Sequence, residues 1–581
     1  MTIDFRNVNT LWASILVETL HRLGLTTAVI CPGSRSTPLT IAFANHSNIE
    51  AIPILDERSA SFFALGIAKK SGLPVVLVCT SGTAGANFYP AVIEAKESHV
   101  PLLILTADRP PELRHCHAGQ TIDQVKLYGN YPNWQTEIAV PSAEEGMINY
   151  LRQTLIYAWE RSLFPARGVV HLNLPFREPL APIPNSDTEK IQFNFDVENF
   201  FTEINLLNFP SSNRIEKYEK IIPKWQLFQR GIIIAGVDHS YNPQEYCRAI
   251  ARLSEFLKYP VLGEALSPVR NYAALNPYLI STYDLILRNS SLAENLKPDI
   301  VIQIGELPTS KELRTWLDIT QPPRWIIDNK GENLDALHGK TIHLRTSIEQ
   351  LANSLSFKET ISNSPYLKLW CDTEKKVRKT IDQTLESIDS LLEGKIAWLL
   401  SQTLPENTPI FIANSMSVRN AEFFWQPNNF KYIPYFNRGA NGIDGTLSTA
   451  LGIAHHHQSS VMLTGDLALL HDNNGFLINK KFRGHLTIIL VNNDGGGIFE
   501  MLPIAQFDPY FEDFFATPQT VNFGKLCLAY GIDHYLIQDW QQLKQLLNPL
   551  PETGIRVLEL NTNRKLDAEW LKTNLSKFSL T

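Results

Sequence analysis

The sequence predicts an α/β protein of three domains, each built around a doubly wound parallel sheet. Short apolar runs alternate with stretches of helical periodicity along the chain, which is typical of strand-helix-strand units. The length of 581 residues accommodates three or four domains. A proline-rich segment at 178–187 and a serine-rich segment at 354–364 indicate linkers. We therefore expect domains at residues 1–185, 186–360 and 361–581.

The first domain contains a glycine loop and a helix that begins with acidic residues. The helix is expected to start at Asp56 and Glu57, because small and apolar residues recur at helical spacing from Ala60 to Ala68. Glu57 lies in its first turn, where the helix dipole alone favours an acidic residue. The glycine loop, residues 80–87, follows an apolar run. The predicted strands of this domain are residues 28–31, 48–55, 75–79, 101–106 and 168–174.

The second domain is predicted from apolar runs at residues 231–235, 260–263, 299–305 and 324–328. Gly339, Lys340 and Thr341 resemble the end of a phosphate-binding P-loop, but Leu334 stands where that motif requires a glycine. The sequence therefore does not support nucleotide binding by this domain.

The third domain places polar residues after two of its predicted strands, which are residues 409–413, 432–435, 461–463, 486–491 and 556–560. Asp466 follows one strand and Asn493 the next, and residues 467–482 are long enough for a crossover helix. Both side chains are then expected at the carboxyl edge of a parallel sheet, where ligands bind. With a carbonyl group of the glycine turn at Gly495, they suit Mg²⁺ bound to phosphate oxygens. Ordinary turn roles are equally compatible with this segment alone.

Composition excludes several classes of function. The formal net charge of −7 argues against a general nucleic-acid or anionic-membrane binder, since such partners require basic patches. No apolar run approaches the roughly 20 residues that span a bilayer, and the N-terminus has no secretory pattern. Six scattered cysteines without a CxxC pair favour reduced thiols and a cytoplasmic location. The run from His455 to His457 is expected at a solvated helix end, and no zinc site is assigned to it.

Glu57 after a strand, the glycine loop at 80–87 and the distant pair Asp466 and Asn493 together resemble the thiamine diphosphate enzymes. Three denser motifs narrow the resemblance: CPGSRSTPL at 31–39, TADRPPEL at 106–113 and NRGANGIDG at 437–445. They are similar to motifs of the menaquinone-pathway synthase family, whose product is 2-succinyl-5-enolpyruvyl-6-hydroxy-3-cyclohexene-1-carboxylate. Leu467 stands where most thiamine diphosphate enzymes have a third glycine, and leucine is characteristic of this branch.

The resemblance implies a transferase of the carboligase type that uses thiamine diphosphate and Mg²⁺, with Mn²⁺ able to substitute. The expected reaction is decarboxylation of 2-oxoglutarate and conjugate addition of the resulting succinyl carbanion to isochorismate, in menaquinone or phylloquinone biosynthesis. In such enzymes the glutamate that matches Glu57 hydrogen-bonds the aminopyrimidine ring of the cofactor and favours the imino form, which removes the thiazolium C2 proton. Both substrates are dicarboxylates, which planar guanidinium groups bind well.

The resemblance also implies which residues form the site. Catalytic roles fall to Glu57, Ser34, Arg35 and Gln120. Substrate binding falls to Arg35, Arg109, Gln120, Lys311, Ser415, Arg419 and Arg438, and all four arginines are expected on loops that follow strands. The cofactor is assigned to Glu57, Ile443, Gly465, Asp466, Leu467, Asn493, Gly495, Ile498 and Phe499, and the metal to Asp466, Asn493 and Gly495. Glu312 stands where the family is expected to have a second basic residue beside Lys311, so the sequence departs from the pattern there.

Enzymes of this kind assemble with the glutamate-bearing domain of one subunit against the diphosphate-binding domain of another, so we expect a homodimer or homotetramer. The first and third domains are expected to be distant structural duplicates. Two alternatives remain. One is another thiamine diphosphate enzyme, a 2-oxo acid decarboxylase or an acetolactate-type synthase, which the arginine-rich motifs disfavour. The other is a non-enzymatic cofactor-binding scaffold, which has no need of Glu57, Asp466 and Asn493 together.

Overall fold

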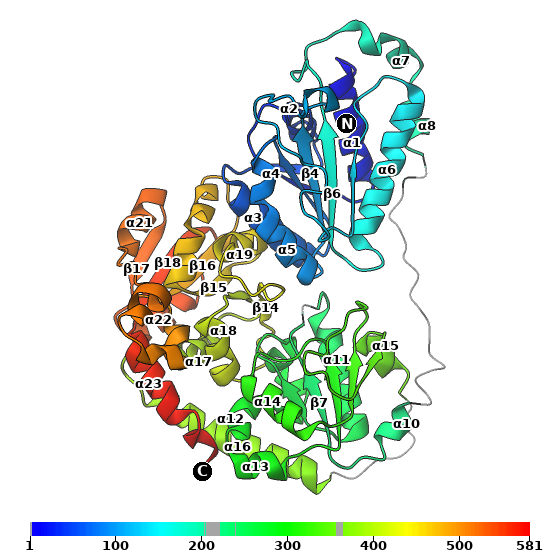
Figure 1. Ribbon diagram of the computed structural model, residues 1–581. Coiled ribbons are helices and arrows are strands. Elements are labelled where there is room, and N and C mark those ends of the chain that lie inside the picture. The colour runs from blue at the N-terminus through cyan, green and yellow to red at the C-terminus, as the bar shows by residue number, and fades with distance from the viewer. Residues whose placement is uncertain (1–2, 203, 205–220, 239, 356–363, 581) are drawn as a thin grey trace. The chain divides into compact units, whose positions relative to one another are not determined.

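The computed structural model describes residues 3–202, 204, 221–238, 240–355 and 364–580. The chain forms two compact units. The first consists of Met1–Ser211, Asn437–His455 and His471–Arg483, and the second of Ser212–Phe436, His456–Leu470 and Gly484–Thr581. One six-stranded parallel sheet lies within each of the three predicted domains (Figure 1), which confirms the predicted fold class. The boundaries after residues 185 and 360 stay predictions, and most of the serine-rich linker lies outside the described residues.

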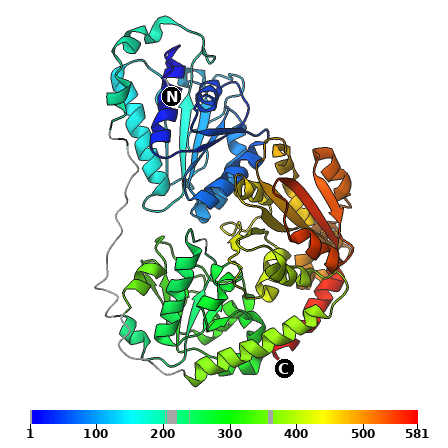
Figure 2. The same cartoon turned by 180° about the vertical axis from the view of Figure 1, so that it is seen from behind.

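The first sheet is covered by helices on both faces and has the strand order β2-β1-β3-β4-β6-β5. Because both faces are covered, β1, β3, β4 and β6 are buried along their whole length. One face carries α1 (Val8–Arg22), α2 (Thr37–Ala44) and α6 (Glu145–Leu163), and the other carries α3 (Glu57–Ser71) and α5 (Tyr89–Glu97), as Figures 1 and 2 show. The strands are β1 (Thr27–Ile30), β2 (Glu50–Pro53), β3 (Val75–Cys79), β4 (Leu102–Asp108), β5 (Trp134–Glu137) and β6 (Val169–Pro175).

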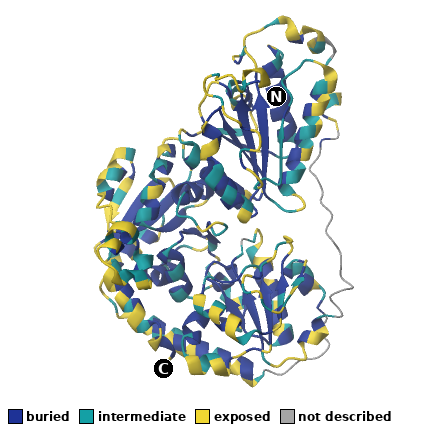
Figure 3. Ribbon diagram, in the orientation of Figure 1, coloured by how far each residue is buried: buried dark blue, intermediate teal, exposed yellow. Residues whose placement is uncertain are grey.

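The second sheet has the order β12-β11-β10-β7-β8-β9. Ile233 on one face packs with α11 (Pro243–Leu257) and α15 (Ile348–Asn353), whereas Ile232 and Ile234 on the other face join a core that continues into the third sheet. Figure 3 shows the strands of these sheets buried beneath more exposed helices. The strands are β7 (Gly231–Ala235), β8 (Val261–Gly263), β9 (Leu279–Ile280), β10 (Ile300–Ile304), β11 (Arg324–Ile327) and β12 (Thr341–Leu344).

The third sheet, β14-β13-β15-β16-β18-β17, repeats the strand order of the first. In both sheets the order runs second, first, third, fourth, sixth and fifth, which is the order expected of structural duplicates and distinguishes these two sheets from the middle one. The direction in which successive strands are added across the sheet reverses between β1 and β3 and between β13 and β15, and such switch points bind ligands. The strands are β13 (Pro409–Ile412), β14 (Ile433–Tyr435), β15 (Ser460–Gly465), β16 (His485–Asn492), β17 (Asp533–Leu536) and β18 (Gly554–Asn561).

Two expectations about secondary structure need correction. The segment predicted as one crossover helix, 467–482, is instead α20 (Asp466–His471) followed by the 3-10 turn η5 (Asn473–Ile478). Four strands were not predicted, namely β5, β9, β12 and β17, and each is an edge strand of its sheet. None of the helices within the described ranges combines the length and apolar character that a bilayer crossing requires.

Helix α19 (Thr446–Ala454) packs closely against α3 inside the first unit. A Cβ atom added to Gly66 would lie 2.1 Å from the carbonyl oxygen of Thr449, so the two backbones are in contact there. Gly445, at the start of α19, has φ +63°, and a Cβ there would overlap the ring of Phe62. This packing fixes the segment 437–445 against the helix that begins with Glu57.

Candidate functional site

Asp466 and Asn493 lie at neighbouring strand tips of the third sheet, as predicted from the sequence. β15 and β16 pair in parallel with Gly465 opposite Val491, so the residues that follow them emerge at the same edge. Asp466 then begins α20, and Asn493 leads into the glycine loop.

The Asp466 carboxylate is buried and is held by backbone amides. Its Oδ1 accepts a hydrogen bond from Leu467 N at 2.7 Å, and its Oδ2 accepts one from Gly495 N at 2.8 Å. Burial raises the pKa of Asp466 to about 6, in spite of these two donors. A carboxylate held in this way favours a nearby cation, because the positive charge would lower the pKa of the carboxyl group toward its ordinary value.

Asn493 is buried and presents only one end of its amide to the protein. Its Nδ2 donates to Glu393 Oε1, while its Oδ1 has no hydrogen-bond partner among the described residues. A buried carbonyl oxygen without a donor is costly unless a ligand satisfies it. Together with the Asp466 carboxylate it forms a partial set of hard oxygen donors, and these residues therefore fit a small divalent cation.

The glycine loop beyond Asn493 requires residues without side chains. Gly495 has φ +134°, and a Cβ there would lie 2.4 Å from the carbonyl oxygen of Ala516. Gly496 N donates to the same oxygen at 2.7 Å. Ile498 and Phe499 follow in the 3-10 turn η6 (Gly497–Met501), half-buried beside the loop.

Arg564, in α23 (Arg564–Asn574), holds the outside of this loop. Its Nη1 donates to Asp494 O at 2.8 Å, its Nε lies 3.0 Å from Glu500 Oε1, and its Nη2 pairs with Glu512. The loop is thus fixed by one half-buried guanidinium group that binds three acceptors.

Glu393 was not predicted, and its carboxylate supports Asn493 at this site. It begins α17 (Glu393–Thr403), is buried, and its N donates to Asp567 Oδ1 at 3.2 Å. Burial, and then the neighbouring Asp567 carboxylate, raise the pKa of Glu393. No local sequence signal identifies it, because an acidic residue in the first turn of a helix is commonplace.

A second group of predicted residues gathers at the carboxyl edge of the first sheet. Arg35, after β1, is buried, donates from Nη1 to Phe176 O at 2.9 Å and lies 3.3 Å from Glu178 Oε1. Its Nε has no partner among the described residues. Burial, and then the nearby charge of Arg109, lower the pKa of Arg35. The positive charge of both arginines at this sheet edge favours an anionic ligand.

Arg109 and Gln120 hold the neighbouring loops. Arg109 Nη2 donates to Gly119 O at 3.0 Å, and Gln120 Nε2 donates to Ser81 O at 2.9 Å. Gln124, which was not predicted, is buried and accepts from Gly82 N at 2.9 Å. Ser34 is exposed on the loop after β1. Ser34, Arg35 and Gln120 thus all lie on loops at the carboxyl edge of the first sheet.

Glu57 is the first residue of α3 and is half-buried. The segment that carries Arg438 and Ile443, both half-buried, is anchored in the same unit by Glu94. The buried Glu94 carboxylate accepts from Gly439 N at 3.1 Å and from Ala440 N at 2.7 Å. Glu94, which anchors the segment that carries Arg438 and Ile443, was not predicted either.

The remaining predicted residues lie in the second unit. Ser415, after β13, has φ +69°, and its carbonyl oxygen accepts from Arg419 Nη1 at 2.7 Å. Arg419 lies within α18 (Met416–Phe424), so the expectation that it occupies a loop is wrong. Lys311 is exposed at the start of α14 (Lys311–Thr320), and Glu312 beside it lies 3.6 Å from Arg288 Nη1.

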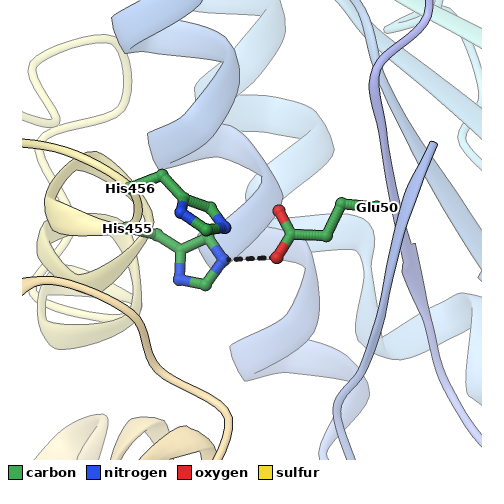
Figure 4. Close-up of side chains that lie close together, drawn as sticks. All are labelled: Glu50, His455 and His456. Carbon is green, nitrogen blue, oxygen red and sulfur yellow. Dashed lines mark hydrogen bonds and ion pairs between the residues drawn. The ribbon is translucent and has the colours of Figure 1, made fainter. Parts of the chain in front are cut away.

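The histidine run also differs from expectation. His455 caps the C-terminal end of α19, as expected, but it is buried. Its Nε2 lies 3.1 Å from Glu50 Oε1 (Figure 4), and its Nδ1 accepts from Arg483 N at 3.3 Å. His455 therefore joins β2 to α19 within the first unit instead of meeting solvent.

Comparisons with known proteins agree with this architecture. Family models described as "Thiamine pyrophosphate enzyme, N-terminal TPP binding domain", "Middle domain of thiamine pyrophosphate" and "Thiamine pyrophosphate enzyme, C-terminal TPP binding domain" match residues 12–127, 210–412 and 415–559. A solved benzoylformate decarboxylase from Polynucleobacter necessarius has the same fold, with a TM-score of 0.69 and 16% identity over 95% of this chain and 98% of that chain. Fold and site thus define a thiamine diphosphate enzyme.

Proteins of similar sequence show which family of thiamine diphosphate enzymes this chain belongs to. The 2-succinyl-5-enolpyruvyl-6-hydroxy-3-cyclohexene-1-carboxylate synthase of Rippkaea orientalis is 65% identical over 100% of this chain and 98% of its own length. The synthases of Trichormus variabilis and of a Synechococcus strain are 64% and 52% identical, over 100% and 98% of this chain and 99% and 97% of their own lengths. The chain belongs to the 2-succinyl-5-enolpyruvyl-6-hydroxy-3-cyclohexene-1-carboxylate synthase family.

Proposed function

We propose that this protein catalyses the thiamine diphosphate dependent decarboxylation of 2-oxoglutarate and the conjugate addition of the resulting succinyl unit to isochorismate. The products are 2-succinyl-5-enolpyruvyl-6-hydroxy-3-cyclohexene-1-carboxylate and CO₂, in menaquinone or phylloquinone biosynthesis. The observation that carries the proposal is full-length similarity to relatives that bear this synthase name, at identities of 52% to 65%.

The strand tips of the third sheet would hold the diphosphate through Mg²⁺, for which Mn²⁺ could substitute. Asp466 would contribute a carboxylate oxygen, Asn493 its unpartnered Oδ1, and Gly495 its carbonyl oxygen. The glycine loop lets backbone approach the anionic group closely. Gly465, Leu467, Ile498 and Phe499 border this position and would contact the cofactor.

The cofactor, when bound, supplies the electron sink that decarboxylation of a 2-oxo acid requires. Glu57, half-buried at the start of α3, would hold a proton on the aminopyrimidine nitrogen. Ile443 would support the ring from an apolar side, on the segment that Glu94 and Phe62 fix.

The substrate carboxylates require fixed positive charge. Arg35 follows β1 and Arg109 follows β4 at the carboxyl edge of the first sheet, and the Nε of Arg35 lacks a partner among the residues described there. We assign substrate binding to these two arginines, to Arg419, Arg438 and Lys311, and to the hydrogen-bonding groups of Ser34, Gln120 and Ser415. Guanidinium forks suit carboxylates better than ammonium groups do.

We further propose a homodimer or homotetramer with active sites between subunits, located in the cytoplasm. This assembly is supported by family membership, and sedimentation of the purified protein tests it. A monomer that turns over substrate would contradict the shared-site proposal.

The decisive experiment mixes purified protein, Mg²⁺, thiamine diphosphate and 2-oxoglutarate, with and without isochorismate, followed by mass analysis. We expect the condensed product, and rapid CO₂ release only when isochorismate is present. Rapid CO₂ release that is unchanged without isochorismate would instead indicate a simple 2-oxo acid decarboxylase.

A further inference from the structure

We propose that Glu393 is a positioning residue that sets which end of the Asn493 amide faces the metal site, an inference that rests on the proposed function. Asn493 has two ends of opposite character, an acceptor Oδ1 and a donor Nδ2. Only the Oδ1 can bind a cation, so the site works in one of the two amide orientations.

Glu393 supplies the contact that selects this orientation. Its buried Oε1 accepts from Asn493 Nδ2, and its Oε2 accepts from Asn420 Nδ2 at 3.3 Å. Each asparagine is left with a buried Oδ1 that has no partner among the described residues. Rotation of the Asn493 amide by half a turn would set Oδ1 against Glu393 Oε1, which replaces a hydrogen bond by contact between two acceptor oxygens.

The position of Glu393 is itself rigid. It begins α17, and its backbone N is held by Asp567 Oδ1 at 3.2 Å, from the first turn of α23. The carboxylate therefore reaches Asn493 from a helix start tied to a second helix, and its other oxygen is held by Asn420 Nδ2.

The test measures Mn²⁺ affinity by electron paramagnetic resonance titration of the full-length protein with thiamine diphosphate present and no substrate. We expect Glu393→Ala to weaken Mn²⁺ binding by roughly tenfold or more, since partners of metal ligands typically contribute at that level. Glu393→Gln keeps one acceptor oxygen for one of the two amides, so its loss should be smaller.

Glu374→Ala is the matched control. Glu374 is a buried carboxylate of the same unit, but its oxygens accept from Ser281 Oγ at 2.5 Å and Thr282 N at 2.9 Å, neither of which belongs to the predicted site. Its removal should lower the thermal midpoint of the metal-free protein without changing Mn²⁺ affinity well below that midpoint.

The outcomes separate the two proposals. If the unaltered protein does not bind Mn²⁺ in the presence of thiamine diphosphate, the metal site and this inference both fail. If it binds Mn²⁺ and Glu393→Ala binds it equally well, the metal site stands and the role of Glu393 is refuted. An equal loss in Glu393→Ala and Glu374→Ala would also refute it, because the effect would then be general.

Discussion

Gly66 of α3 and Gly452 of α19 meet backbone to backbone: a Cβ on Gly452 would lie 3.1 Å from the Gly66 Cα and 2.1 Å from the carbonyl oxygen of Phe63. The crossing holds the helix that begins with Glu57 against the segment that carries Ile443. Two small residues at one crossing point allow this approach, and no larger side chain fits between the helices.

Gly452→Ala should therefore destabilise the protein. Alanine is more favourable than glycine in a helix by about 1 kcal/mol. Overpacking of a tight contact costs about 1–3 kcal/mol, so the destabilisation should exceed the gain in helix propensity. The thermal midpoint is the measurement. Gly146→Ala in α6 is the control, because a Cβ at Gly146 meets nothing within 4 Å, and this variant should be as stable as the unaltered protein or more so. Equal midpoints for both variants would contradict the close crossing.

Asp472→Asn should change how stability depends on pH. Asp472 is fully buried, accepts from Ser448 N at 2.7 Å, and burial raises its pKa from 3.8 to about 7. A raised pKa means that the folded chain binds the proton more tightly. The contribution to stability is therefore complete below pH 3.8 and is lost as the pH rises through about 7.

Asparagine keeps an acceptor for Ser448 N and carries no charge to bury. The variant should match the unaltered protein near pH 4 and exceed it in thermal midpoint at pH 8, by an amount equivalent to a few kcal/mol at most. Midpoint curves that run parallel from pH 4 to pH 8 would disprove this account.

Asp466→Ala should weaken the joint binding of thiamine diphosphate and Mg²⁺ by more than about tenfold, because it removes a proposed metal ligand. Calorimetric titration at fixed Mg²⁺ measures the change. Asp494→Asn is the comparison, since Asp494 is an exposed acid on the same loop and asparagine tolerates its φ of +57°. The metal assignment fails if Asp466→Ala binds the cofactor as tightly as Asp494→Asn does.

Glu57→Gln should preserve cofactor binding and reduce turnover by roughly 100-fold or more, as expected when a proton-holding carboxylate is lost. Glu145→Gln is matched in chemistry and position, because Glu145 is likewise the first residue of a helix, α6, and is exposed. It should leave turnover unchanged. Equal activity in both variants would remove Glu57 from the mechanism.

The strands that the sequence predicts and those it misses differ in burial. β3 and β16 are buried along nearly their whole length because helices cover both faces, and the apolar runs within them are easy to recognise. The missed β17 lies at a sheet edge with its residues half-buried or exposed, so its pattern is polar and weak. An edge strand is stabilised by its neighbour more than by its own composition.

The site residues also divide into those that the sequence predicts and those that it misses. Asp466 and Asn493 could be predicted because strand ends and a glycine loop mark them locally. Glu393 and Glu94 could not, because each acts on a segment far away in sequence, Glu393 on Asn493 and Glu94 on Ala440. Buried carboxylates that support a loop reveal themselves only through the tertiary structure.

The strand order shared by the first and third sheets makes their loop positions equivalent. Where the first sheet offers Arg109 after its fourth strand, the third offers Asn493, and where the first offers Ser81 after its third strand, the third offers Asp466. The same topology therefore presents equivalent positions twice in one chain, and the loop residues at those positions decide whether a sheet edge suits a carboxylate or a cation.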